Sequence, residues 1–172
     1  MSQRVIGRIP VRVCLEAKRR RAHRLYVARG ARDLQDIRAA AGALPVEECD
    51  KRRLDELADG QVHQGVVLDA APLPVQNGDQ WIERGFPDDA VVVLLDSIED
   101  PHNFGAIVRT AVAAGVHGIV FPKDRSAPLS PAALKSAAGA MEYAPLVQIT
   151  NLARFLGQLK DAGFWLAALA EE

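Results

Sequence analysis

Residues 90–110 read AVVVLLDSIEDPHNFGAIVRT, and this stretch decides the fold class of the second half of the chain. Its first six residues are continuously apolar, which is typical of a strand buried on both faces of a parallel sheet. After a polar loop, residues 105–114 carry small and apolar side chains at helical spacing and end at Gly115. Asp100 or Asn103 fits the cap of this helix, and Pro101 fits its first turn. The stretch therefore predicts a strand, a loop and a crossover helix.

The same alternation continues downstream of this unit. We expect further strands at residues 116–121, 146–149 and 164–169, and helices at residues 131–140 and 152–162, the last one capped by Asn151. Strands that alternate with crossover helices predict an open, mostly parallel, Rossmann-like sheet over residues 89–172.

The first 70 residues predict a separate small domain. A helix is expected around Val11, Val13 and Leu15, with a basic run at its far end. Short strands are expected at residues 25–28, 44–46 and 66–68, helices at 31–41 and 50–57, and a loop at 60–65. This order predicts a compact α/β/α sandwich. Residues 71–88 are rich in Pro, Gly and Asn and predict a linker, in which Trp81 and Ile82 could form a short helix.

Composition narrows the class of protein. Of 172 residues, 49% are hydrophobic, which is enough to fill a core. No apolar run approaches the roughly 18 residues of a membrane span, and the N-terminus lacks a signal-peptide pattern, so a cytoplasmic location is expected. Cys14 and Cys49 are too few for a disulfide framework or a metal quartet. The four histidines are scattered, which argues against a zinc site.

Charge is distributed unevenly along the chain. Residues 1–70 carry 14 Lys and Arg against 10 Asp and Glu, whereas residues 71–172 carry 7 against 12. Within residues 1–29, nine basic side chains face a single acid, Glu16. Such a cluster attracts polyanions. For the consecutive residues Lys18 to Arg21 we expect contacts with phosphate, the alternative being a basic helix face that is only solvated.

The loop after Leu95 is the richest candidate site. Ligands of open α/β sheets gather beyond the carboxyl ends of the strands. Arg109 comes one helical turn after Gly105, so its guanidinium can reach over this small residue and bind a phosphate or carboxylate. An ion pair of Arg109 with Asp96 or Glu99 is the alternative. No dinucleotide fingerprint, phosphate-binding P-loop or hydrolase nucleophile elbow is present in the sequence.

Residues 96–110 resemble the first motif of the SpoU (TrmH-like) methyltransferases, whose core is Asn-x-Gly with an Arg four residues on. Three further stretches are similar to the bacterial ribosomal-RNA branch of this family. They are residues 114–117 with 122–126, residues 135–140, and residues 62–66. The resemblance covers essentially the whole chain in order.

This resemblance implies a fold and a reaction. Residues 1–70 would be a ribosomal-protein-like RNA substrate domain, 71–88 a linker, and 89–172 the front part of an α/β-knot (SPOUT) domain. The family uses S-adenosyl-L-methionine, works as homodimers, and in this branch methylates a guanosine ribose of large-subunit ribosomal RNA. The implied catalytic residues are Arg109 and Asn103. The implied RNA-binding residues are Arg12, Lys18, Arg19, Arg20, Arg21, His63 and Gln64.

Arg109 suits one of two catalytic roles better. A guanidinium has a pKa above about 12, so it is a poor general base. We therefore expect Arg109 to orient the ribose and the adjacent phosphate and to stabilise the developing alkoxide. Asn103 would hold this geometry by hydrogen bonds.

The sequence also departs from the family pattern. A glycine-containing cofactor loop and a Ser-Leu-Asn segment, which complete the knot in the family, do not occur before Glu172. We therefore expect a truncated or partial form that binds the cofactor poorly or not at all, and assign no cofactor-binding residue. Three functions stay open: an RNA 2'-O-methyltransferase, a non-catalytic RNA-binding module, and a metabolic enzyme using Arg109 on a small carboxylate. Salt-sensitive RNA binding separates the first two from the third.

Overall fold

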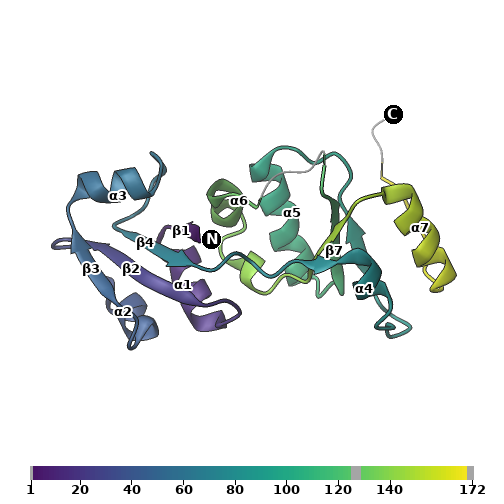
Figure 1. The fold of residues 1–172 in the computed structure, drawn as a ribbon, viewed down its shortest axis with the longest axis horizontal. Helices are drawn as coiled ribbons and strands as arrows, with labels where there is room; N and C mark the ends of the chain where they lie inside the picture. The colour runs from purple at the N-terminus through teal and green to yellow at the C-terminus, as the bar shows by residue number, and fades with distance from the viewer. Residues whose placement is uncertain (1, 125–128, 170–172) are drawn as a thin grey trace.

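A computed structural model describes residues 2–124 and 129–169. It contains two four-stranded sheets that follow one another along the longest axis of the molecule, with the N-terminal sheet at the left of Figure 1. Helices cover both faces of each sheet (Figure 1). No helix of these two ranges is long and apolar enough to cross a membrane.

The first sheet is mixed. Its strands lie in the order β1 (Gln3–Ile6), β4 (Val66–Ala70), β2 (Ala22–Ala28) and β3 (Val46–Cys49). Strand β4 runs antiparallel to both of its neighbours, and β3 runs parallel to β2. Helices α1 (Arg8–Ala17) and α2 (Gln35–Ala41) pack on one face, and α3 (Lys51–Leu57) packs on the other.

Alternation along the strands explains these two covered faces. In β1, Val5 belongs to the core beneath α1 and α2, whereas the next residue, Ile6, belongs to the core beneath α3. Successive strand side chains point to opposite faces, so each strand contributes to both cores. The predicted α/β/α sandwich is confirmed, although β1 was not expected as a strand.

Helix α1 buries Val11 and Leu15 as expected, but not Val13. Its buried residues are Pro10, Val11, Cys14 and Leu15, at the spacing of a helix. Val13 is only half-buried, and it packs against Gly139 of the second half of the chain. Val13 thus lies at the junction of the two sandwiches and not in the first core.

The second sheet is parallel throughout, as predicted. Its strands lie in the order β5 (Gln76–Asn77), β8 (Leu146–Ile149), β7 (Gly118–Pro122) and β6 (Val92–Leu94). One face is covered by α5 (Pro101–Ala113), α6 (Pro131–Ser136) and the short 3-10 helix η1 (Ala140–Glu142). The other face is covered by α4 (Gly78–Ile82) and α7 (Leu152–Asp161).

Part of the expected linker belongs to this second sheet. Residues 76–82 form β5 and α4, and Trp81 in α4 is 3% exposed. Its indole lies so close to Gly118 of β7 that a Cβ there would be 2.4 Å from the ring. The linker of the structure is therefore shorter than residues 71–88.

The strand predicted at residues 164–169 is wrong. Phe164 packs edge-on against Phe86, with 5.2 Å between ring centroids, while Trp165 and Leu169 are fully exposed. Among the described residues no strand pairs with this segment. Its apolar pattern alone does not make a strand, because a strand needs backbone hydrogen bonds to a neighbour.

One apolar core runs through both sandwiches. It joins Val5, Val11 and Leu25 of the first half to Phe104 and Met141 of the second half. The two sheets are thus connected by packed side chains as well as by the chain itself.

Candidate active site

The candidate site begins at the N-terminus of α5. The Asp100 carboxylate accepts hydrogen bonds from the backbone N–H groups of His102, at 3.2 Å, and Asn103, at 3.1 Å. These bonds satisfy donors that an α-helix leaves free at its start. Asp100 is therefore the cap, and Pro101 occupies the first turn as expected.

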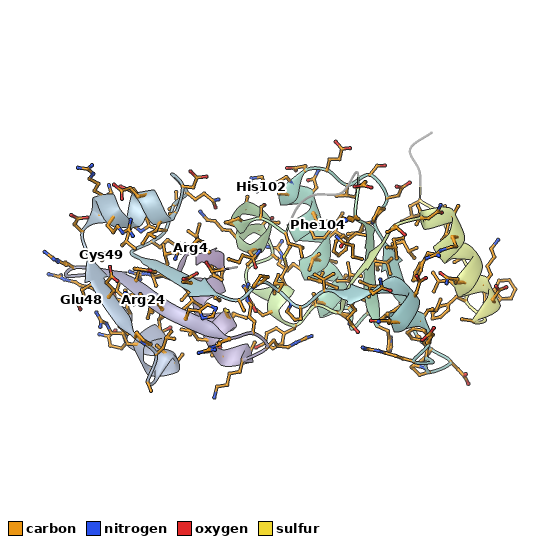
Figure 2. The ribbon with its side chains drawn as sticks, in the orientation of Figure 1. Arg4, Arg24, Glu48, Cys49, His102 and Phe104 are labelled. Carbon is orange, nitrogen blue, oxygen red and sulfur yellow. The ribbon has the colours of Figure 1, made fainter. Side chains whose placement is uncertain are left out.

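The side chains of this first turn point in opposite directions. Phe104 is fully buried and packs edge-on against Phe121 of β7, whereas His102 is exposed. Figure 2 shows His102 at the outer edge of α5 and Phe104 in the interior. The aromatic contact fixes the helix on the sheet, so its outer face is held at the carboxyl end of β6.

Gly105 serves close packing between two helices. A Cβ on Gly105 would lie 2.5 Å from the carbonyl oxygen of Ala133 and 2.7 Å from Cβ of Ser136, both in α6. The Ser136 hydroxyl in turn donates to the His102 carbonyl at 2.8 Å. The close approach that this glycine permits is therefore that of α6.

Arg109 lies on the exposed face of α5. Within residues 2–124 and 129–169, no carboxylate lies within 4.0 Å of its guanidinium, so the ion pair with Asp96 or Glu99 is not formed there. Helical side chains lean toward the N-terminus of their helix, which directs Arg109 back toward the first turn of α5. Its donors are thus available to a substrate.

Asn103 and Arg109 lie on one helix but on different faces. Six residues separate them, which places their side chains about 120° apart around the helix axis. The Asn103 side chain is exposed and makes no hydrogen bond to another described residue. His102, seven residues before Arg109, shares its face. A group bound at the first turn would meet Asn103 and Arg109 from two sides.

A hollow of about 250 Å³ opens at the carboxyl ends of β5, β8 and β7. It is lined by Asn77, Gly78, Asp79, Lys123, Gln148, Ile149, Thr150, Asn151, Arg154 and Phe155. Gln158 donates to Asp79 at 3.1 Å and Arg154 donates to both of its oxygens at 2.8 Å, which lowers the pKa of Asp79.

The hollow carries two cationic side chains, Lys123 and Arg154, and the Asp79 carboxylate that Arg154 binds. No cofactor contact is assigned to it. Residues 125–126, which contribute to the family resemblance, lie outside the described residues.

Three of the four consecutive basic side chains face water. Lys18 follows α1 in a left-handed conformation, with φ of 52°, and turns the chain. Lys18, Arg19 and Arg21 are exposed, and Arg19 also donates to the carbonyl oxygen of Tyr143 at 3.2 Å. Arg12 is exposed as well, with Glu16 at 3.9 Å and Asp36 at 3.7 Å.

The structure does not present Arg20, which was expected to bind RNA, to the solvent. The side chain is buried, and its Nε and Nη2 donate to the two oxygens of Glu142, at 3.1 and 2.5 Å. The reason is the left-handed turn at Lys18, after which successive side chains no longer share one helix face. A guanidinium held in this way is not available to a phosphate.

His63 and Gln64 shape a loop in front of β4. His63 is 9% exposed; its Nδ1 accepts from Gly65 N–H at 2.9 Å, and its Nε2 lies 3.1 Å from the Asp55 carboxylate. Both ring nitrogens of His63, which was expected to contact RNA, are thus engaged by protein groups. Gln64 is exposed, and its side-chain oxygen accepts from Arg8 N–H at 2.9 Å, at the start of α1.

Glu142 was missed by the sequence reasoning. The one signal that could have found it is that Glu142 is the single charged residue of the mostly apolar segment at residues 140–149. A carboxylate in such a segment is expected to have a buried cationic partner. Nothing in the sequence says that this partner is Arg20.

The parallel sheet and the Asn-x-Gly-x-x-x-Arg pattern on α5 define a methyltransferase-type α/β chain of the SpoU class. A family profile described as "SpoU rRNA Methylase family" matches residues 90–172. Another, described as "RNA 2'-O ribose methyltransferase substrate binding", matches residues 4–76. The chain belongs to the SpoU rRNA methylase family.

Among its relatives are two 23S rRNA (guanosine-2'-O-)-methyltransferases named RlmB. That of Pseudomonas aeruginosa is 41% identical over 180 residues, which cover 99% of this chain and 71% of the relative. That of Escherichia coli K12 is 36% identical over 182 residues, which cover 100% of this chain and 73% of the relative.

Solved structures show the same fold. The rRNA methyltransferase from Sinorhizobium meliloti superposes with a TM-score of 0.74 at 21% identity, covering 94% of this chain. The SpoU methyltransferase AviRb from Streptomyces viridochromogenes, in complex with AdoMet, superposes with a TM-score of 0.71 at 19% identity, covering 93% of this chain. The chain spans 60% of the length of each of these two solved chains.

Proposed function

We propose that this chain belongs to an S-adenosylmethionine-dependent RNA ribose 2'-O-methyltransferase that acts on large-subunit ribosomal RNA in the cytoplasm. The observation that carries the proposal is the identity of 36–41% with the RlmB relatives over essentially the whole chain. The guanidinium of Arg109 supports the proposal because it is exposed and has no carboxylate partner among the described residues, so it can bind a substrate.

Methyl transfer to a ribose requires an in-line approach and loss of the hydroxyl proton. The bound cofactor supplies a methyl group on a sulfonium. The guanidinium of Arg109 donates hydrogen bonds that orient the ribose and its phosphate and stabilise the oxygen as negative charge develops. Asn103, about 120° away on α5, holds the nucleotide from its other side.

RNA would be held mainly by the exposed basic side chains of the first sandwich. Lys18, Arg19 and Arg21 cluster just after α1, and Arg12 lies within that helix. The ion pairs of Arg12 with Glu16 and Asp36 are long and exposed, so they compete weakly with a phosphate. Gln64, exposed at the opposite end of α1, would add a polar contact.

We further propose that residues 1–70 form the RNA substrate domain, residues 89–172 belong to the methyltransferase domain, and the enzyme is a homodimer. The large apolar side chains of Trp165 and Leu169 are fully exposed, and Val91 is 56% exposed beside the edge strand β6. Exposed apolar groups at a sheet edge support a contact with further protein.

The proposal is tested by incubating the full-length protein that contains this chain with S-adenosylmethionine carrying a labelled methyl group and with 23S ribosomal RNA from cells that lack the modification. Label at a single guanosine ribose, resistant to alkaline hydrolysis, is the expected result. RNA binding without any methyl transfer would instead identify a non-catalytic RNA-binding module. If the protein neither binds RNA nor transfers a methyl group to it, both readings are refuted.

A further inference from the structure

A buried ion pair connects the two sandwiches. The side chains of Arg20, after α1, and Glu142, at the end of η1, are 1% and 2% exposed, although 122 residues separate them in the sequence. The guanidinium uses Nε and Nη2 on the two carboxylate oxygens. This bidentate arrangement fixes the direction of both groups as well as their distance.

The remaining donor group of Arg20 is bound by the first sandwich and by the start of the connection. Nη1 donates to the side-chain oxygen of Gln3 in β1, at 2.5 Å, and to the carbonyl oxygen of Ala71, at 3.0 Å. The Gln3 oxygen also accepts from Leu73 N–H at 3.3 Å. Arg20 therefore ties η1, β1 and the connecting chain together at one point.

Other contacts around this ion pair hold the same junction. Gly139 lies so close to α1 that a Cβ there would be 2.7 Å from Val13. The Lys135 ammonium donates to the Val62 carbonyl at 3.0 Å, and Arg19 donates to the Tyr143 carbonyl at 3.2 Å. The junction is thus packed, hydrogen-bonded and charged along its length.

A charged pair is a specific way to join two domains. Replacing such a pair by apolar groups is often neutral or stabilising, so stability alone does not account for it. Apolar contacts tolerate sliding, whereas a buried carboxylate and guanidinium lose their partners if the domains rotate. The pair therefore favours a single relative orientation.

This orientation relates the two halves of the candidate site. Arg20 stands between the exposed Arg19 and Arg21, and Glu142 belongs to η1, which packs on the same face of the second sheet as α5. We propose that Arg20 and Glu142 are positioning residues that hold the basic surface of the first domain at a fixed distance from Arg109. RNA bound to that surface then presents its ribose to α5. This inference rests on the proposed function.

The two native cysteines report on the junction. Cys14 of α1 is buried beside Arg20 and Glu142, whereas Cys49 is buried under α3 in the far core of the first sandwich. In Glu142→Gln, loss of the carboxylate charge should open the junction and raise the alkylation rate per Cys14 thiolate, taken from the pH dependence of the reaction, at least tenfold relative to that of Cys49. Asp79→Asn, which removes the charge that pairs with exposed Arg154 and lies in the surroundings of neither cysteine, is the matched control and should leave the ratio unchanged.

A second variant covers the case that Glu142→Gln does not fold. Arg20→Lys keeps a buried positive charge next to Glu142 but loses the bidentate geometry. It should raise the alkylation ratio as well, by a smaller factor. Cys14 as protected as in the unchanged protein, in a folded variant that lacks the bidentate contact, would overturn the proposal.

Kinetics separates positioning from mere stability. In the protein that transfers methyl groups, Glu142→Gln should lower kcat at least tenfold and change KM for RNA less than threefold, because the exposed basic residues remain. An opened junction with unchanged kcat would overturn the positioning role. So would a variant in which KM for RNA rises and kcat does not fall. If the unchanged protein neither binds nor methylates RNA, the proposed function fails, and the alkylation ratio still decides whether the pair fixes the domains.

Discussion

Two arginines of this chain differ in their surroundings. Arg20 is enclosed at the junction of the sandwiches, and three protein groups accept its hydrogen bonds. Arg109 lies on an exposed helix face without a carboxylate partner in the described ranges. A buried guanidinium needs acceptors from the protein, whereas an exposed one can exchange water for a substrate. The difference teaches that an arginine in a basic run need not be the one that binds.

The largest effect should follow from removing Arg20, the enclosed one of the two arginines. Arg20→Ala leaves the Glu142 carboxylate buried and unpaired, which should cost about 3–5 kcal/mol of unfolding free energy. Urea titration followed by circular dichroism measures this loss. Arg24→Ala, in an exposed ion pair with Glu47, serves as the control and should leave the midpoint nearly unchanged. Equal midpoints for both variants would contradict the distinction.

Arg109→Ala should lower the rate of methyl transfer and leave the stability unchanged, whereas Arg20→Ala lowers the stability. The substitution leaves the core untouched, so the unfolding midpoint should stay the same, while kcat for methyl transfer falls by about 10²–10³, as for loss of one charge-stabilising donor. Single-turnover transfer of labelled methyl groups measures the rate. Arg84→Ala, another exposed arginine of the second half, should keep full activity. Retained turnover in Arg109→Ala would remove Arg109 from the mechanism.

Removing the exposed basic side chains that follow α1 should have an intermediate effect, on RNA affinity. Changing Lys18, Arg19 and Arg21 together to Gln should weaken RNA binding about tenfold or more at low salt and reduce the slope of log affinity against log salt by about 2–3. Filter binding at several salt concentrations gives both quantities. Lys51, Arg52 and Arg53 of α3, changed together to Gln, alter the net charge by the same amount. Identical losses in the two triple variants would mean that RNA senses only total charge.

The smallest effect concerns the cap that orients the site. Asp100→Ala removes the acceptor of two N–H groups at the start of α5 and should cost about 1 kcal/mol. Asp100→Asn keeps an acceptor and should recover most of that loss. Thermal unfolding of the three proteins measures the order. An asparagine variant no better than alanine would show that the charge, and not the hydrogen bond, stabilises the helix.

Local signals were sufficient for much of the fold. The apolar run before Asp96, the cap at Asp100 and the proline after it act within a few residues of one another, so α5 and the parallel sheet could be predicted. Strand β5 could not, because two polar residues, Gln76 and Asn77, show no periodicity. Residues 164–169 show the converse, since their apolar character suggested a strand that has no partner among the described residues.

The candidate residues could be named from the sequence, but their geometry could not. Asn103 and Arg109 could be named from the sequence, yet their separation around the helix follows only once the helix is known to begin at Pro101. The burial of Arg20 depends on how two domains dock, which no pattern within the first 29 residues contains. Likewise, the ring of His63 is enclosed because the loop that carries it brings it within 3.1 Å of Asp55 in the preceding helix, α3. The sequence does not show this contact.

The shared core has a consequence for how this chain can be divided. Because Val5, Val11 and Leu25 pack into the same apolar cluster as Phe104 and Met141, a fragment cut at residue 70 would expose that surface to water. Such a fragment is expected to self-associate, and the family boundary between substrate and catalytic regions is then a poor place to separate them for expression. The two regions should instead melt together, as a single cooperative unit.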